Sequence, residues 1–302
     1  MRSGLTSRAG RAVPPAIRAA IRYLPPRGRG IRLAHEWTRR RPPDGTVYVS
    51  REPGGARLQC DLRDHLSRVL YYRGWMDAGL ESWIRGWLRP GDVYADVGAH
   101  IGYLAALAAR AVGPAGRVVA FEPSPETCAK LRTAFAGGDF PQVEVVNAAV
   151  AADHSGEATL FTADGVWENQ AYRNSLHPGE GLRSHATVAT VSLDGSFPSG
   201  QVRLLKVDVE GGEMAVLSGA EELLASGRCE ALVVELNPEA LARAGSSVAG
   251  LVDRLDRAGY DAYRCDPVGT LLPWRPVDVQ TEFEDAVFLP GAGTTCHYDP
   301  RR

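Results

Sequence analysis

The chain has few cysteines and no long apolar run. Its five cysteines are scattered over 302 residues and form no C-x-x-C pair, so neither a zinc site nor a disulfide framework is expected. This cysteine usage fits a reducing cytoplasm, which is the compartment we expect. No stretch of about 18 apolar residues occurs, so a membrane span is not expected. The early arginines are not followed by an apolar segment of the kind that secretory or twin-arginine signals contain.

The chain as a whole also has no large excess of positive or negative charge, but its charged residues are unevenly distributed. The formal net charge is -2, yet residues 1–41 hold 11 arginines against one acid, Glu36, for a formal charge of +10. Apolar residues between Ile17 and Leu24 recur at helical spacing, which predicts a short amphipathic helix. This basic arm is therefore a candidate for peripheral contact with a membrane surface or an acidic partner. The alternative is a solvated arm docked on its own domain.

A glycine-bearing turn is the most informative segment of the chain. Residues Asp96-Val-Gly-Ala-His-Ile-Gly102 follow an apolar run and precede an Ala/Leu-rich segment, which predicts a strand, a tight loop and a helix. Glycines there let a ligand approach the backbone closely. Glu122 ends the next apolar run, where a carboxylate can accept hydrogen bonds from two ribose hydroxyls. The pair predicts a nucleoside-containing cofactor.

The spacing of the glycines narrows the choice of nucleoside. Gly98 and Gly102 enclose three other residues, which departs from the G-x-G-x-x-G pattern of nicotinamide-dependent oxidoreductases. The loop fits better the D-x-G-x-G-x-G pattern of class I methyltransferases, with His100 in place of the middle glycine. The expected cofactor is then S-adenosylmethionine. Taken alone, the loop could also be an ordinary strand-to-helix turn.

From Arg89 onward, predicted strands alternate with predicted helices, which is typical of an α/β fold with a mostly parallel sheet covered on both faces. We expect strands near 93–98, 117–122, 143–149, 202–209, 230–236, 260–264 and 285–289, and helices near 102–112, 125–136, 213–226 and 246–258. Ligands of such sheets bind beyond the carboxyl ends of the strands. Five polar residues fall at or near those ends: Asp96, Glu122, Asn147, Asp208 and Glu235.

Two further segments flank or interrupt this pattern. Residues 46–90 predict a hairpin from Val47–Ser50 and Arg57–Asp61, then a helical stretch with aromatic residues that favour a core position, although a lid role stays open. The polar stretch of about residues 151–200 is a candidate substrate-facing segment. The alternative is an extra pair of edge strands with a mobile loop. His177 lies within it.

The segment of residues 202–213 predicts a buried strand that ends in two carboxylates. In an extended chain, Asp208 and Glu210 would point to the same face. They are candidates for a general base, a metal ligand or an acceptor of cofactor hydrogen bonds, and the alternative is that they cap the next helix. His177 is a third candidate base. The sequence offers no full set of metal ligands, so no metal is predicted.

Six blocks in this order and spacing resemble the FkbM-type family of S-adenosylmethionine-dependent methyltransferases, over about residues 65 to 290. The blocks are Asp96–Gly102, Phe121–Pro125, Val145–Ala149, Leu193–Asp194, Leu204–Gly211 and Val233–Leu236. The resemblance implies a Rossmann-like class I methyltransferase fold with seven strands, the last antiparallel. It also implies O-methylation of a hydroxyl on a sugar, polyketide or other small metabolite. The family usually has Asn where this chain has His100.

The implied organisation is a basic arm and linker (1–45), a hairpin and helical lid segment (46–90), a methyltransferase domain (91–290) and a tail (291–302). We expect Asp96, Gly98 and Gly102 to hold the methionine end of the cofactor, with His100 beside it. Glu122 is expected to bind the ribose, and residues around Asn147 the adenine edge. The acceptor is expected to be a small-molecule or glycan hydroxyl, with no nucleic-acid partner. A catalytically inactive module that docks a partner or a membrane is the alternative.

Overall fold

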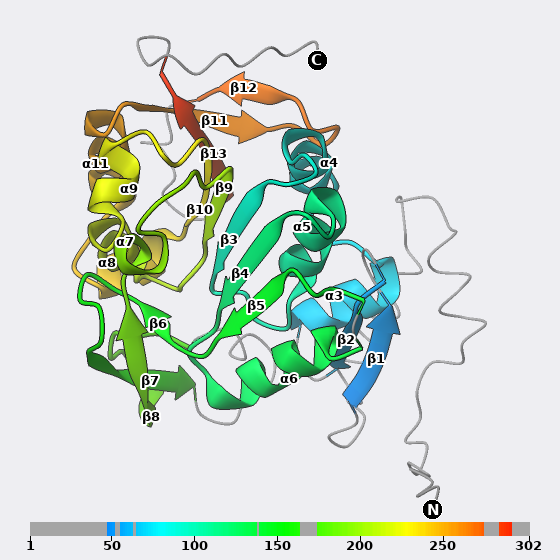
Figure 1. Cartoon of the computed structure of the whole chain (residues 1–302). Coiled ribbons are helices and arrows are strands. Elements are labelled where there is room, and N and C mark those ends of the chain that lie inside the picture. Colours follow the sequence, from blue (N-terminus) through cyan, green and yellow to red (C-terminus); the bar gives the residue numbers. More distant parts are fainter. Residues whose placement is uncertain are drawn as a thin grey trace, which may run out of the picture.

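The computed structural model of the chain describes residues 47–51, 55–62, 65–137, 139–163, 174–274 and 284–291. The basic arm, its expected amphipathic helix and residues 292–302 lie outside these ranges. An eight-stranded sheet runs through the centre of the fold (Figure 1), in the order β12-β11-β13-β10-β9-β3-β4-β5. Its strands are β3 (Val93–Val97), β4 (Arg117–Phe121), β5 (Val143–Val146), β9 (Leu204–Val207), β10 (Leu232–Leu236), β11 (Tyr260–Cys265), β12 (Leu271–Pro273) and β13 (Glu284–Pro290).

The direction of the strands confirms the predicted fold class. The neighbours β5, β4, β3, β9 and β10 pair in parallel, and β13 pairs antiparallel with both β10 and β11. The predicted number of strands is one too few, because β12 forms an eighth strand at the edge of the sheet. Three residues are too short a run to show a period, so no sequence pattern predicts this strand.

Helices cover both faces of this sheet (Figure 1). One face packs against α4 (Ala78–Trp87), α5 (Tyr103–Val112) and α6 (Pro125–Phe135). The other packs against α8 (Glu213–Ser218), α9 (Glu221–Ala225), α10 (Pro238–Arg243) and α11 (Val248–Arg257). The predicted helix of residues 213–226 is two helices, and α10 was not predicted. None of the helices among the described residues has the length and apolarity needed to cross a membrane.

The helix boundaries follow the chemistry of the chain. Ser124 caps α6, since its hydroxyl accepts a hydrogen bond from the Thr127 amide, and Pro125 occupies the first turn, where no amide donor is needed. The α5 segment is rich in alanine and leucine and ends at Gly113. These signals place α5 and α6 directly after β3 and β4, so the loops between them lie at the carboxyl edge of the sheet.

The stretch of residues 151–200 forms its own small sheet, which corrects the expectation of edge strands. The strands β6 (Ala149–Val150), β7 (Glu157–Ala163) and β8 (Leu182–Val191) make a three-stranded sheet in the order β6-β8-β7, separate from the central one. The predicted strand of residues 143–149 therefore splits into β5 and β6. A short helix, α7 (Leu193–Ser196), leads back toward β9.

The N-terminal segment packs onto the α/β core. The predicted hairpin is present as β1 (Val47–Arg51) and β2 (Arg57–Asp61), and the predicted helical stretch is two helices, α3 (His65–Arg73) and α4, separated near Gly74. The core position expected for the aromatic side chains is confirmed for four of them: Tyr71, Tyr72, Trp83 and Trp87 are buried. Trp75 is only partly buried and lies under the Arg73 guanidinium.

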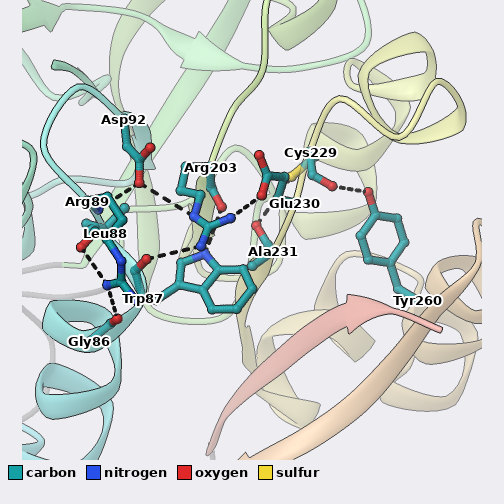
Figure 2. A network of polar contacts seen from close by, with 10 residues as sticks. All are labelled: Gly86, Trp87, Leu88, Arg89, Asp92, Arg203, Cys229, Glu230, Ala231 and Tyr260. Carbon is teal, nitrogen blue, oxygen red and sulfur yellow. Dashed lines mark hydrogen bonds and ion pairs between the residues drawn. The ribbon is translucent and has the colours of Figure 1, made fainter. Parts of the chain in front are cut away.

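Arg203, just before β9, ties α4 to the amino-terminal edge of the sheet (Figure 2). Its guanidinium lies 4.2 Å from the centroid of the Trp87 ring and forms ion pairs with Asp92 and Glu230. In return, Trp87 Nε1 donates a hydrogen bond of 3.0 Å to the Arg203 carbonyl. Both charged partners are mostly buried, so these contacts are stronger than surface ion pairs. This network lies at the edge opposite to the one where ligands are expected.

Replacing Arg203 by Met should lower the free energy of unfolding by about 2–3 kcal/mol, because Glu230 and Asp92 lose their shared cation. The matched control is Arg257→Met, which breaks an exposed i,i+4 pair with Asp253 and should change the free energy by less than about 0.5 kcal/mol. Urea denaturation measures both variants. Equal effects would contradict the structural role of the Arg203 network.

Candidate functional site

A cavity opens at the carboxyl edge of the central sheet, between the loops that follow β3, β4 and β9. Its polar lining comes mainly from the predicted motifs, and its apolar lining from Val97, Phe121 and the start of the small sheet. Leu66 of α3 and residues of the 151–200 stretch close the other side. The lining residues with chemical importance are Gly98, His100, Glu122, Asn174, Asp208 and Glu210. The structure thus brings both sequence motifs to one cavity.

Gly98 joins the glycine loop to the acidic loop. Its φ is +85°, and a Cβ added there would lie 1.8 Å from the Asp208 carbonyl oxygen. A side chain is therefore excluded by contact as well as by backbone conformation. The Gly98 amide donates to the Phe121 carbonyl at 3.0 Å, and the Asp208 amide to the Val97 carbonyl at 3.0 Å. These contacts fix the two loops relative to each other.

Glu122 is buried at the end of β4 and holds the glycine loop. Its Oε2 accepts a hydrogen bond of 3.0 Å from the His100 amide, and its Oε1 accepts one of 2.9 Å from the Ser124 amide. Burial raises the pKa of Glu122 to about 7, although the two amide donors act in the opposite direction. The carboxylate borders the cavity, so it can also accept hydrogen bonds from ligand hydroxyls.

His100 has a left-handed backbone conformation, with φ of 51°. Histidine, asparagine and aspartate adopt this conformation more often than other side chains. The conformation gives a physical reason why a histidine can occupy this position of the loop. The same conformation directs the His100 amide to Glu122.

Three predicted cofactor residues lie around the cavity without being among its lining residues. Asp96 is 1% exposed beneath the glycine loop, and burial raises its pKa to about 6. Gly102, with φ of +90°, precedes α5 and packs against Leu131. The Asn147 side chain donates to the carbonyls of Glu122 and Pro123, so it orders the loop after β4, while its neighbour Ala148 borders the cavity.

The acidic motif departs from the predicted extended chain. Strand β9 ends at Val207, and Glu210 has φ of 54°, so Asp208 and Glu210 do not share the face of a strand. Both still border the cavity. Neither caps α8. Instead, the Glu213 carboxylate accepts hydrogen bonds from the Val209 and Gly211 amides at 3.3 and 3.1 Å, which frees the two acids of the motif from that role.

Lys206 is a functional candidate that the sequence reasoning did not single out. It is 5% exposed in the middle of β9, and its Nζ lies 2.6 Å from Asp208 Oδ2. Burial alone would lower the pKa of Lys206, but the negative charges of Asp208, Asp285 and Asp96 raise it, so the ammonium is retained. A lone lysine within an apolar strand was the available signal, since such a residue needs a buried partner.

The third candidate base, His177, lies behind the cavity wall. Its amide donates to the Ser175 hydroxyl, which in turn donates to the Glu210 carbonyl at 3.0 Å. Burial and the nearby Arg243 lower the pKa of His177. Its neighbours Asn174 and Leu176 line the cavity, whereas His177 is not among the described lining residues. Its position favours a supporting role for the loop.

The donor set fits S-adenosylmethionine. A carboxylate at the end of β4 suits two ribose hydroxyls, the apolar wall of Phe121, Ala148 and Val150 suits a flat base, and the acids after β9 suit the positive charges of a sulfonium and an ammonium. Gly98 leaves the backbone open where a side chain would fill the loop. No three His, Cys, Asp or Glu side chains come together to hold a metal ion within the described ranges.

Comparison with known families decides the identity. The family model of the methyltransferase FkbM domain matches residues 96–262, which is more than half of the chain. The chain belongs to the FkbM methyltransferase family. The match contains the glycine loop, Glu122 and the acidic loop, so the cofactor of this FkbM family member is S-adenosylmethionine. No curated protein matches the chain.

Solved structures that resemble this FkbM family member are distant in sequence. An S-adenosylmethionine-dependent O-methyltransferase from Thermotoga maritima is 14% identical with a TM-score of 0.38, and the alignment covers 72% of this chain and 66% of that one. Methyltransferase FkbM from Methylobacillus flagellatus KT is 12% identical with a TM-score of 0.43, over 74% and 54%. A TehB-like methyltransferase from Corynebacterium glutamicum is 13% identical with a TM-score of 0.40, over 74% and 93%. The chain thus spans about two thirds of the length of the Thermotoga maritima protein and about half of the length of the Methylobacillus flagellatus protein.

Replacing Gly98 by Ala should lower the free energy of unfolding by more than the backbone strain of a positive φ alone would cause. The matched control is Gly91→Ala, since Gly91 has φ of +93° but nothing within 4 Å of an added Cβ. The control should lose about 1–2 kcal/mol of unfolding free energy from backbone strain, whereas Gly98→Ala should lose about 3 kcal/mol or more from the added clash. Thermal and urea denaturation measure the difference. Similar losses would show that the Gly98–Asp208 contact relaxes.

The raised pKa of Glu122 should make its contribution to stability depend on pH. Glu122 binds its proton more tightly in the folded protein than in the unfolded chain, where its ordinary pKa is 4.5. The stabilisation that protonated Glu122 contributes is therefore present at low pH and is lost as the pH rises toward about 7. Relative to Glu122→Gln, the free energy of unfolding of the wild type should fall by about 2–3 kcal/mol between pH 5 and pH 8. If the difference in unfolding free energy between the wild type and Glu122→Gln were the same at every pH, the raised pKa of Glu122 would be contradicted.

Proposed function

We propose that this protein is an S-adenosylmethionine-dependent O-methyltransferase that acts on a hydroxyl of a sugar, a polyketide or another small metabolite. The observation that carries the proposal is the shared cavity, which is bordered by the Glu122 carboxylate on one side and by Asp208 and Glu210 on the other. The first side has the chemistry of a ribose site. The second has carboxylates that can orient a hydroxyl donor.

The residues around the glycine loop would hold the cofactor. In the proposal, Glu122 accepts from the ribose hydroxyls, the segment after Asn147 lies along the adenine, and the Gly98–His100 backbone faces the methionine part. Asp96 contributes negative charge from beneath the loop rather than a direct contact, because it is almost fully buried. S-adenosylmethionine supplies a methyl group that is bonded to a positively charged sulfur. When the methyl group is transferred, the sulfur becomes a neutral thioether.

The remaining task of the protein is to align an acceptor and to remove one proton. A neutral aliphatic hydroxyl is a weak nucleophile, so a base within hydrogen-bond reach is expected. The acidic loop and the 151–200 stretch, which supplies Asn174 and Leu176, border the cavity away from Glu122. We assign the acceptor to that side. The positions of α3 and its Leu66 are consistent with the lid role proposed for residues 46–90.

A direct test measures formation of S-adenosylhomocysteine by the full chain with a panel of hydroxylated acceptors, including sugars, glycosides and polyketide alcohols. We expect the full chain to form S-adenosylhomocysteine with at least one of these acceptors, and not with the matched deoxy analogues. Binding of S-adenosylmethionine without turnover on any acceptor would instead support the inactive docking module. Methylation of an amine or a carbon acceptor alone would contradict O-methylation.

The ribose assignment has its own test by calorimetry. Replacing Glu122 by Ala should weaken S-adenosylhomocysteine binding about 10- to 100-fold, because hydrogen bonds to a charged acceptor are lost. The control is Glu144→Ala on β5, where the carboxylate is exposed and pairs with Arg117 away from the cavity. Its affinity should match that of the wild type. An unchanged affinity in Glu122→Ala would overturn the assignment.

A further inference from the structure

Glu210, which lines the cavity, lies on a backbone turn that needs support from its surroundings. Glu210 has φ of 54° and Gly211 has φ of +107°, so two successive residues are left-handed. A residue with a side chain keeps this conformation only where surrounding contacts impose it. The Glu213 carboxylate accepts from two amides of the turn, and a Cβ added at Gly211 would lie 2.5 Å from the Ala240 carbonyl oxygen. The turn is therefore fixed on the side of α8 and α10.

The carbonyl of Glu210 accepts two hydrogen bonds from outside the turn. Ser175 Oγ donates to this carbonyl at 3.0 Å, and Arg243 Nη2 donates at 3.4 Å. The serine is 1% exposed and the arginine side chain is 14% exposed, so water competes little for either bond. The bond from the guanidinium is also strengthened by its charge. Together the two donors hold the peptide group of Glu210 in one orientation.

Ser175 lies between two residues that line the cavity. Its neighbours Asn174 and Leu176 both border the side of the cavity that we assign to the acceptor, and we call these two residues the acceptor wall. The backbone of Ser175 pairs with Phe161 of β7 through hydrogen bonds of 2.8 and 3.0 Å, so the acceptor wall is attached to the small sheet. The Ser175 hydroxyl is therefore the link between the acceptor wall and the turn at Glu210.

Arg243 makes the same connection from α10. A Cβ added at Gly179 would lie 2.4 Å from Arg243 Cδ, so the arginine side chain packs closely against the segment that follows the acceptor wall. At the other end of α10, Asn237 Nδ2 lies 3.5 Å from Glu210 Oε2. The helix thus contacts both the carbonyl and the carboxylate of Glu210.

The other acid of the loop is held in a different way. Lys206 Nζ lies 2.6 Å from Asp208 Oδ2, and this lysine is buried within β9. The position of the Asp208 carboxylate is therefore set by the central sheet. A shift of the acceptor wall would change the distance between Glu210 and Asn174, whereas Asp208 would stay in place.

We propose that Ser175 and Arg243 are positioning residues for the methyl acceptor, because they hold the turn at Glu210 in a fixed place relative to the acceptor wall. The inference rests on the proposed O-methyltransferase function, which places the acceptor on this side of the cavity. Neither residue is among the described residues that line the cavity, so both act through Glu210. The Glu210 carboxylate accepts a hydrogen bond from the acceptor hydroxyl, and Asn174 contacts a neighbouring polar group of the acceptor.

The first test compares Ser175→Ala with the matched control Ser196→Ala, which removes a hydroxyl bond of 2.8 Å to the Ser192 carbonyl outside the cavity lining. Ser175→Ala should lower kcat/KM for the acceptor about 10- to 100-fold, because the reacting hydroxyl is misplaced. The calorimetric affinity for S-adenosylhomocysteine should stay within about threefold, because Glu122 borders the other side of the cavity. Ser196→Ala should behave as the wild type.

Arg243→Met should reproduce the effect of Ser175→Ala on kcat/KM. Its matched control is Arg254→Met, since Arg254 donates to the Leu217 carbonyl at 3.3 Å and pairs with an exposed glutamate, as Arg243 does. The control should keep the kcat/KM of the wild type.

A double-mutant cycle separates positioning through Glu210 from a general loss of structure. In single-turnover assays, Ser175→Ala should lower the rate of a Glu210→Ala protein by less than about twofold, because no carboxylate is left to position. A loss as large as in the wild-type background would overturn the inference. Full activity of Glu210→Ala would overturn it as well, and so would a loss of S-adenosylhomocysteine affinity in Ser175→Ala that equals the loss of kcat/KM.

The last test does not depend on turnover. Amide hydrogen exchange in residues 209–212 should become about threefold faster or more in Ser175→Ala and in Arg243→Met, because each variant removes a hydrogen bond that anchors the turn. Exchange should be unchanged in Ser196→Ala and Arg254→Met. Unchanged exchange in the first two variants would contradict the inference. If no acceptor is methylated, the proposed function fails, while hydrogen exchange still decides whether Ser175 and Arg243 hold the turn.

Discussion

The close approach of Gly98 to the Asp208 carbonyl is the constraint on which the rest of the site depends. The glycine loop and the acidic loop come from parts of the sequence 110 residues apart, and they meet because β3 and β9 are neighbours in the sheet. A backbone contact this close leaves no room for either loop to move independently. The cofactor side and the acceptor side of the cavity are therefore held in register by the main chain rather than by flexible side chains.

The acidic side chains near this edge of the sheet have different electrostatic environments. Each of Asp96, Glu122, Glu235 and Asp285 has a pKa raised by burial, whereas Lys206 neutralises one neighbour directly. One buried cation among several carboxylates cannot satisfy them all. The arrangement leaves an excess of negative potential at the carboxyl edge, which favours a positively charged sulfonium and disfavours anionic acceptors.

The sequence was sufficient for the elements with strong local signals. The strands β3, β4 and β9 consist mostly of apolar residues, and Ser124 with Pro125 marks the start of α6, so these elements and their order could be predicted. The convergence of Glu122, Asp208 and Glu210 on one cavity also followed from the rule that ligands bind at the carboxyl ends of parallel strands. This part of the site is a property of the topology.

The remainder depends on tertiary contacts that leave no periodic trace. The turn at Glu210, the separate sheet of β6, β7 and β8, and the short strand β12 result from packing rather than from local pattern. The ion pair of Lys206 with Asp208 could be predicted only if β9 were already known to be buried on both faces. The position of His177 behind the cavity depends on an isolated bridge between Phe161 and Ser175, which a sequence alone does not reveal.

The left-handed conformations of His100 and Glu210 bear on how this protein can be engineered. Both residues sit in loops at the cavity, in a backbone region that glycine adopts with less strain. Selection for thermostability alone would therefore favour glycine at these two positions, whereas selection for activity would retain the side chains. The cavity is thus a place where heat resistance and turnover compete, and stabilising substitutions are better sought at the opposite edge of the sheet.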